Sequence, residues 1–150
     1  MATTTPITDD MRAQWDRALA AFEIRDALML ADEQFGAYAE AIRAFDWEIA
    51  RLQDAHGTRD RAKWGPEGSA AWERVWKALQ AAEQAQYDQF IVPVDQAAVA
   101  VASTPAPDHR ALRRKVEIIK YRELDNYTGI ETPPMEFVAA DARRLLGEVA

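Results

Sequence analysis

The sequence predicts an all-α protein, a long antiparallel helical hairpin that two shorter C-terminal helices complete into a bundle. Composition is the first reason, since Ala occurs 30 times while Val, Ile and Thr occur eight times each. Ala is the best helix former, whereas β-branched residues favour strands. The second reason is a run of apolar residues at alternating spacings of four and three, which is typical of a helix.

The first helix is expected to begin at Thr8, whose hydroxyl can cap free backbone N–H groups. Asp9 and Asp10 follow in the first turn, where negative charge complements the helix dipole. Residues 1–6 are expected to be disordered. No residue firmly stops this helix before the turn at residues 56–60, so we expect 40 or more residues.

A heptad seam is the strongest periodic signal in the chain. It comprises Ile24, Leu28, Ala31, Phe35, Tyr38, Ile42, Phe45, Ile49 and Leu52. Alanines beside the seam widen the apolar face, which favours a bundle over a two-stranded coiled coil. An earlier apolar set is offset from the seam by one residue and consists of Met11, Trp15, Ala18 and Phe22. The helix therefore contacts different partners along its length or breaks near residues 22–27.

Proline and glycine mark the remaining element boundaries. Residues 55–69 are expected to form a loop, and Pro66 can open the second helix, which Pro93 must end or kink. The segment "TPAP" at 104–107 is a sharp stop, and the next helix is expected from about Pro107 to Leu124 with Asp108 in its first turn. Thr132 and Pro133 are expected as cap and first position of a last helix that ends at Gly147. We expect a single domain over residues 1–150.

Composition limits the classes of partner. The net charge of -7 and pI of about 4.9 argue against general binding to nucleic acid or to an anionic membrane, because either needs a positive field at the contact. No signal-peptide pattern and no apolar run of membrane-spanning length are present. The chain has no cysteine. We therefore expect a cytoplasmic protein.

Candidate catalytic and metal-binding patterns are weak. The two histidines, His56 and His109, follow Gln53 and Ala106 at the spacing where a carboxylate metal motif needs Glu. Asp54 lies two residues before His56, but such a pair in a polar turn is typical of a solvated helix end. The glycines form no phosphate-binding loop. The sequence predicts no cofactor, no metal and no enzymatic activity.

Tryptophans gather where the first loop meets the second helix. Trp72 and Trp76 are one helical turn apart and share a face of the helix. Trp64 is close to them in sequence. This cluster is expected to plug the end of the hairpin, although aromatic residues are also enriched where proteins bind partners. Trp47 lies between Asp46 and Glu48, away from the seam, and is the better candidate for an exposed contact.

A basic helix surface follows the "TPAP" stop. Arg110, Arg113 and Arg114 share one face with Glu117 and Lys120, while the apolar residues Leu112, Val116 and Ile119 are expected to dock the helix. Residues 23–54 contain eight Asp or Glu and three Arg. Internal pairing between the basic and the acidic helix is therefore the economical interpretation, and contact with nucleic acid is the alternative.

The stretches "VASTPAPDHRALRRKVEII" (101–119) and "ADARRLLG" (140–147) resemble small, uncharacterised helical proteins encoded in α-proteobacterial genomes and their prophages. The group has no known catalytic residues. The resemblance therefore implies only a setting, that of a small bacterial, cytoplasmic, phage-derived accessory protein.

The function expected from the sequence is non-enzymatic, namely binding of a protein partner or a second copy of the chain. The candidate contact residues are Phe35, Ile42, Trp47, Trp72, Trp76, Arg110, Arg113 and Arg114. One alternative is an acidic regulator or inhibitor that binds a basic nucleic-acid-binding protein. Another is a small helical-bundle enzyme or ligand binder with a pocket inside the bundle.

Overall fold

The computed structural model describes residues 9–127 and 129–147, and it confirms the all-α class. No strand occurs in these ranges. The helices are α1 (Asp9–Phe35), α2 (Ala37–His56), α3 (Gly65–Gln86), α4 (Val92–Ser103), α5 (His109–Tyr121) and α6 (Pro134–Leu146). The expected disorder of residues 1–6 and the expected cap at Thr8 lie outside the described residues. Asp9 and Asp10 do occupy the first turn of α1.

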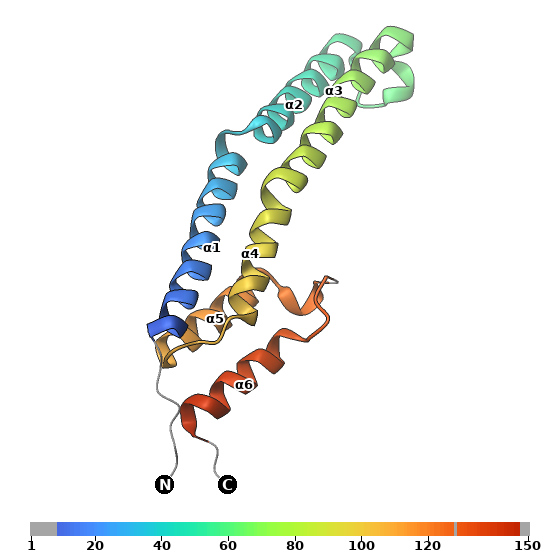
Figure 1. Cartoon of the computed structure of the whole chain (residues 1–150). Helices are drawn as coiled ribbons and strands as arrows, with labels where there is room; N and C mark the ends of the chain where they lie inside the picture. The colour runs from blue at the N-terminus through green and yellow to red at the C-terminus, as the bar shows by residue number, and fades with distance from the viewer. Residues whose placement is uncertain (1–8, 128, 148–150) are drawn as a thin grey trace. The chain divides into compact units, whose positions relative to one another are not determined.

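The chain divides into two compact units. Residues up to Asp26 and from Pro93 onward form one, which we call the bundle unit, and Ala27–Val92 form the other, the hairpin unit. In the hairpin unit α2 packs antiparallel against α3 (Figure 1). The bundle unit holds the first part of α1 with α4, α5 and α6. The single domain expected from the sequence stays a prediction.

The first helix is not continuous, because Gly36 interrupts it between α1 and α2. Gly36 has φ of -82° and ψ of -177°, which is extended backbone. A Cβ at this position would lie 1.9 Å from Asp32 Oδ1 and 2.6 Å from the Asp32 carbonyl oxygen. The expectation of one helix of 40 or more residues is therefore wrong, since the helix is interrupted at Gly36, where any side chain would clash with Asp32.

The break also changes which face of the helix is buried. On α1 the buried apolar residues are Trp15, Phe22 and Met29, which continue the earlier apolar set at intervals of seven. On α2 the heptad seam takes over, with Leu52 buried and Phe45 and Ile49 half-buried. The seam thus packs only after Gly36.

The end of the hairpin has its own small core, formed by Leu52, Trp64 and Ala71. Pro66 lies in the first turn of α3, as expected, where its missing N–H costs nothing. Gly68 leaves room for the Trp64 side chain at the start of α3, because a Cβ there would lie 2.7 Å from Trp64 Cβ.

Pro93 does not end the helix, because its own backbone and that of its neighbours are helical. A π-helical turn, Tyr87–Ile91, precedes it, and Val92 N–H donates to the Tyr87 carbonyl oxygen five residues earlier. Proline lacks an N–H and clashes with the carbonyl four residues before it, and a wider turn accommodates both. The chain consequently stays helical from Gly65 to Ser103.

The core of the bundle unit centres on α4. Its buried residues are Val94, Ala97, Ala98, Val101 and Ala102. Small side chains here permit close helix packing, and larger residues fill the remaining space, among them Phe22, Ile118 and Leu124. The stop at "TPAP" is confirmed, and both Ala106 and Pro107 are buried.

The boundaries of α5 and α6 differ from the expectation at three places. The helix after "TPAP" begins at His109 and ends at Tyr121, short of Leu124. The last helix begins at Pro134 and not at Pro133, and no side chain caps it. Pro133 has φ of -55° and ψ of 135°, because a residue that precedes proline is driven out of helical geometry. The end at Gly147 is as expected, with φ of 76°.

Candidate functional site

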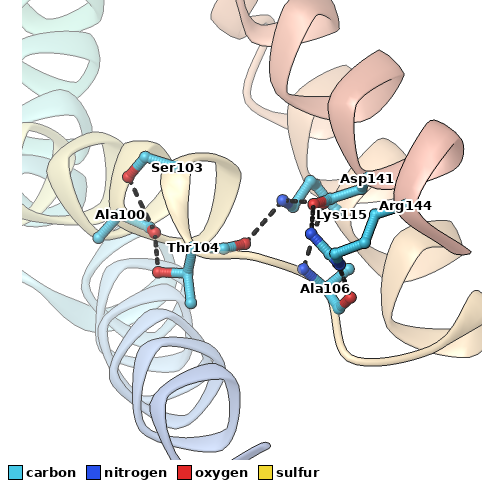
Figure 2. A network of polar contacts seen from close by, with 7 residues as sticks. All are labelled: Ala100, Ser103, Thr104, Ala106, Lys115, Asp141 and Arg144. Carbon is cyan, nitrogen blue, oxygen red and sulfur yellow. Dashed lines mark hydrogen bonds and ion pairs between the residues drawn. The ribbon is translucent and has the colours of Figure 1, made fainter. Parts of the chain in front are cut away.

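A buried polar cluster joins α5, α6 and the segment between α4 and α5 (Figure 2). Lys115 on α5 forms an ion pair with Asp141 on α6 and donates to the Thr104 carbonyl oxygen over 2.7 Å. Asp141 also accepts from Ala106 N–H at 3.2 Å and from Arg144 at 2.9 Å. Arg144 in turn donates to the Ala106 carbonyl oxygen. The cluster therefore holds the "TPAP" turn through the Ala106 N–H and through the carbonyl oxygens of Thr104 and Ala106.

The Lys115 side chain is only 1% exposed, and burial lowers its pKa against the opposing effect of Asp141. A buried charge is tolerated only where its hydrogen bonds are satisfied. No buried side-chain nitrogen or oxygen in the described ranges lacks a partner. Each polar side chain of the cluster has at least one hydrogen-bond partner, which suits a structural role.

The buried face of α5 differs from the one expected. Its buried residues are Ala111, Lys115, Ile118 and Ile119, whereas Leu112 and Val116 are only half-buried. Lys115 lies four residues after Ala111 and three before Ile118, so it shares their face. Sequence reasoning missed Lys115 and Asp141. The available signal was a lysine at an apolar position of an amphipathic helix.

The start of α5 is tied to α1 within the bundle unit. Asp108 is the N-cap and accepts from Ala111 N–H at 2.8 Å. It also pairs with Arg12 of α1 at 2.7 Å. The bond from Arg12, followed by the bond from Ala111, lowers the pKa of the Asp108 carboxyl.

The basic face of α5 is partly used internally. Arg114 lies 3.6 Å from Glu23 on α1 and 3.6 Å from Glu117. Arg110 and Arg113 are exposed, and neither forms an ion pair with any residue in the described ranges. Internal pairing therefore accounts for Arg114 alone of the three arginines.

The aromatic residues at the end of the hairpin are stacked. Trp72 and Trp76 lie parallel, with ring centroids 5.5 Å apart, and Phe45 contacts both. The Arg61 guanidinium lies 3.8 Å above the Trp72 ring. Trp64 is buried, and its indole N–H donates to the Thr58 carbonyl oxygen at 2.9 Å. Trp72 is half-buried, while Trp76 stays partly exposed.

The seam residues of α1 are exposed. Leu28 is 55% exposed and Phe35 is 78% exposed. On α2, Ile42 is 38% exposed and Trp47 is 67% exposed, the latter as expected from its flanking charges. These four residues, which we call the exposed apolar set, belong to the hairpin unit.

No group of three or more His, Asp or Glu residues within residues 9–127 and 129–147 is arranged to hold a metal ion. His56, at the end of α2, is exposed. None of the helices in those same ranges combines the length and the apolar character needed to cross a membrane.

The chain matches no family model, no curated protein and no solved structure.

Proposed function

We propose that this protein works without catalysis, by binding another protein or a second copy of itself through the exposed apolar set on α1 and α2. The observation that carries the proposal is the exposure of Leu28 and Phe35, at 55% and 78%. Burial of a side chain of this size contributes roughly 1.5–3 kcal/mol, so two such residues left in water favour a partner.

The spacing of these residues supports a helical partner. Leu28 and Phe35 are seven residues apart on α1, which is the repeat that pairs helices side by side, whereas Ile42 follows the break at Gly36. The hairpin unit buries the same repeat only from Gly36 onward. The unburied part of the seam on α1 is therefore the proposed contact, and a second copy of α1 carries the same repeat.

The alternative, an acidic regulator of a basic protein, has less support. Of the eight acidic residues at 23–54, several have internal partners: Glu23 faces Arg114, Asp26 accepts from Tyr121, Asp32 accepts from Gln86, and Glu48 pairs with Arg51. This leaves a smaller acidic surface for a partner. The genomic setting suggested by the resemblance, a phage-derived bacterial accessory protein, is retained as part of the proposal.

Light scattering over a range of protein concentrations tests self-association. We expect a dimer that Leu28→Asp with Phe35→Asp converts to a folded monomer, because both positions are exposed and neither change should disturb the interior. Ile42→Asp should weaken the dimer but also strain the hairpin, since Ile42 is less exposed. Circular dichroism reports whether each variant is folded.

The matched control is Met135→Asp, which changes an apolar residue on α6 that is 49% exposed. It should leave the mass unchanged. A wild-type chain that stays monomeric at high concentration would exclude the homodimer. Cross-linking from a photoreactive residue at position 35 would then test for another protein partner. An equal yield of the cross-linked product with and without Leu28→Asp would contradict the proposal.

A further inference from the structure

Charge is distributed unevenly along the hairpin unit. Residues 51–77, which form the end of α2, the connecting loop and the beginning of α3, contain six Lys or Arg and four Asp or Glu. The other residues of the unit, 27–50 and 78–92, contain one Arg and seven Asp or Glu. The tip of the hairpin, meaning residues 51–77, is therefore basic. The rest of the unit, residues 27–50 and 78–92, is acidic, and we call it the shaft.

An open groove of about 820 Å³ lies at this tip. Its floor includes the apolar residues Leu52, Trp64 and Ala71, which form the small core beneath it. Its rim carries Arg51, Arg74 and His56, and one carboxylate, Glu67, also lines it. Apolar floor and cationic rim together suit a ligand that combines an apolar side chain with a carboxylate.

The cations of the rim are in part oriented already. Arg51 pairs with Glu48, and this bond, with a smaller effect from Arg74, lowers the pKa of the Glu48 carboxyl. The Arg51 side chain is nevertheless 48% exposed. A guanidinium has five N–H donors, so a carboxylate on one side leaves others for a ligand. Arg74 is exposed and has no ion pair with a described residue.

We propose that the groove at the tip of the hairpin binds an acidic peptide segment of another protein, with its carboxylates at Arg51 and Arg74. An apolar side chain of the peptide packs against the exposed Pro66 and Ala70, which line the groove together with Leu52 and Trp64. The residues that line this groove include none of the exposed apolar set. Charge complementarity selects the occupant, because a cationic groove with an apolar floor favours a carboxylate beside a hydrocarbon side chain.

A nucleic acid fits these observations less well. Proteins that bind single-stranded nucleic acid stack the bases on free aromatic faces. Here the Arg61 guanidinium lies over the Trp72 ring, and the Trp76 ring is stacked on the Trp72 ring. A long polyanion would also meet the acidic shaft, with its seven carboxylates and one arginine. A short acidic peptide can occupy the tip and avoid that repulsion.

Fluorescence anisotropy of a labelled probe tests the proposal with the full-length protein. The probe is a short capped peptide of alternating Glu and Leu, and its counterpart with Gln in place of Glu measures the contribution of charge. We expect saturable binding of the Glu peptide at low salt that weakens as salt rises, and at least about tenfold weaker binding of the Gln peptide.

The variant Arg51→Gln with Arg74→Gln should lose about tenfold or more in affinity for the Glu peptide. The matched control Arg43→Gln removes an exposed arginine from the shaft and should keep the affinity. Circular dichroism of Arg51→Gln, of Arg74→Gln and of the double variant shows whether each protein is folded, so that a loss of affinity can be told from a loss of structure.

Several results would overturn the proposal: no saturable binding, equal binding of the Glu and Gln peptides, or equal loss in Arg43→Gln. Tighter binding of an oligothymidylate, or of vesicles that contain phosphatidylserine, would assign the tip to nucleic acid or membrane instead. Leu28→Asp with Phe35→Asp should leave peptide binding unchanged, so failure of this site and failure of the proposed association surface give different results.

Discussion

The ammonium group of Lys115 and the carboxylate of Asp141 form an ion pair whose side chains are only 1% and 5% exposed. Removing two charges from water is costly, and a pair repays that cost only where the remaining hydrogen bonds are satisfied. Thr104, Ala106 and Arg144 satisfy them here. The pair consequently fixes where α6 lies on α5, a task that apolar contacts perform poorly because they lack direction.

Asp141→Asn should destabilise the protein by about 3–5 kcal/mol, because it leaves the Lys115 charge buried beside Arg144 without a counter-charge. The amide still offers an oxygen to Ala106 N–H, so the change isolates the effect of charge. Lys115→Met should cost much less, since Arg144 still pairs with Asp141. Urea denaturation followed by circular dichroism measures both, and the double variant should recover much of the loss. Losses that simply add in the double variant would show that the two side chains do not stabilise each other.

Asp108 should make stability depend on pH in the acid range. Its folded pKa lies below the ordinary value of 3.8, so its contribution is fully present above that value and is lost as pH falls through the folded pKa. Asp108→Asn keeps a good N-cap but loses the charge pairing with Arg12. The difference in unfolding free energy between wild type and Asp108→Asn should thus stay constant as the pH is lowered from 7 and shrink only once the pH falls below the ordinary value of 3.8. Asp108→Ala removes the cap as well and should cost about 1 kcal/mol more at pH 7.

Gly36→Ala should destabilise the hairpin by about 1–3 kcal/mol, although glycine to alanine usually stabilises a helical segment. The reason is steric, because the new Cβ would lie 2.6 Å from the Asp32 carbonyl oxygen, which cannot move as a side chain can. Thermal unfolding provides the measurement. Adding Asp32→Ala should relieve only the clash with the carboxylate, and a stabilised Gly36→Ala protein would show that α1 and α2 can merge.

Trp64 and Trp47 should respond oppositely to substitution. Trp64→Phe removes the indole N–H that donates to Thr58 and leaves space in the small core, which should cost about 1–3 kcal/mol. Trp47→Ala changes a residue that is 67% exposed and should alter stability by no more than about 0.5 kcal/mol. Chemical denaturation compares the two, and a large stability loss in Trp47→Ala would place that side chain in an internal contact.

The fold class and most boundaries could be predicted from the sequence because their causes are local. Alanine content and the "TPAP" stop each act over a few residues, whereas Asp108 was expected in the first turn and is the N-cap. The break at Gly36 was harder to foresee, since a glycine within an apolar repeat is often tolerated and only the closeness of Asp32 shows why it is needed. Pro93 was likewise open, because a π-helical turn is chosen by the whole helix around it.

The buried cluster could not be predicted for a different reason. Lys115 and Asp141 are 26 residues apart, and although Lys115 occupies an apolar position of its helix, nothing local indicates that Asp141 is its partner. A lysine amid three arginines is naturally assigned to the wet face. The groove at the tip depends in the same way on residues from two helices that only the hairpin brings together.

The chain passes between its two units at Asp26/Ala27 and again at Val92/Pro93, and both crossings lie within helical backbone. A protease needs an extended stretch of chain and finds none at either crossing. Limited digestion should therefore cut first between α2 and α3 or between α5 and α6, and not between the units. Amide hydrogens flanking the crossings should also exchange slowly, because backbone hydrogen bonds run through both junctions. Movement of one unit relative to the other would then require a helix to bend or unwind, and the π-helical turn beside Pro93 is where the hydrogen-bond ladder is already widened.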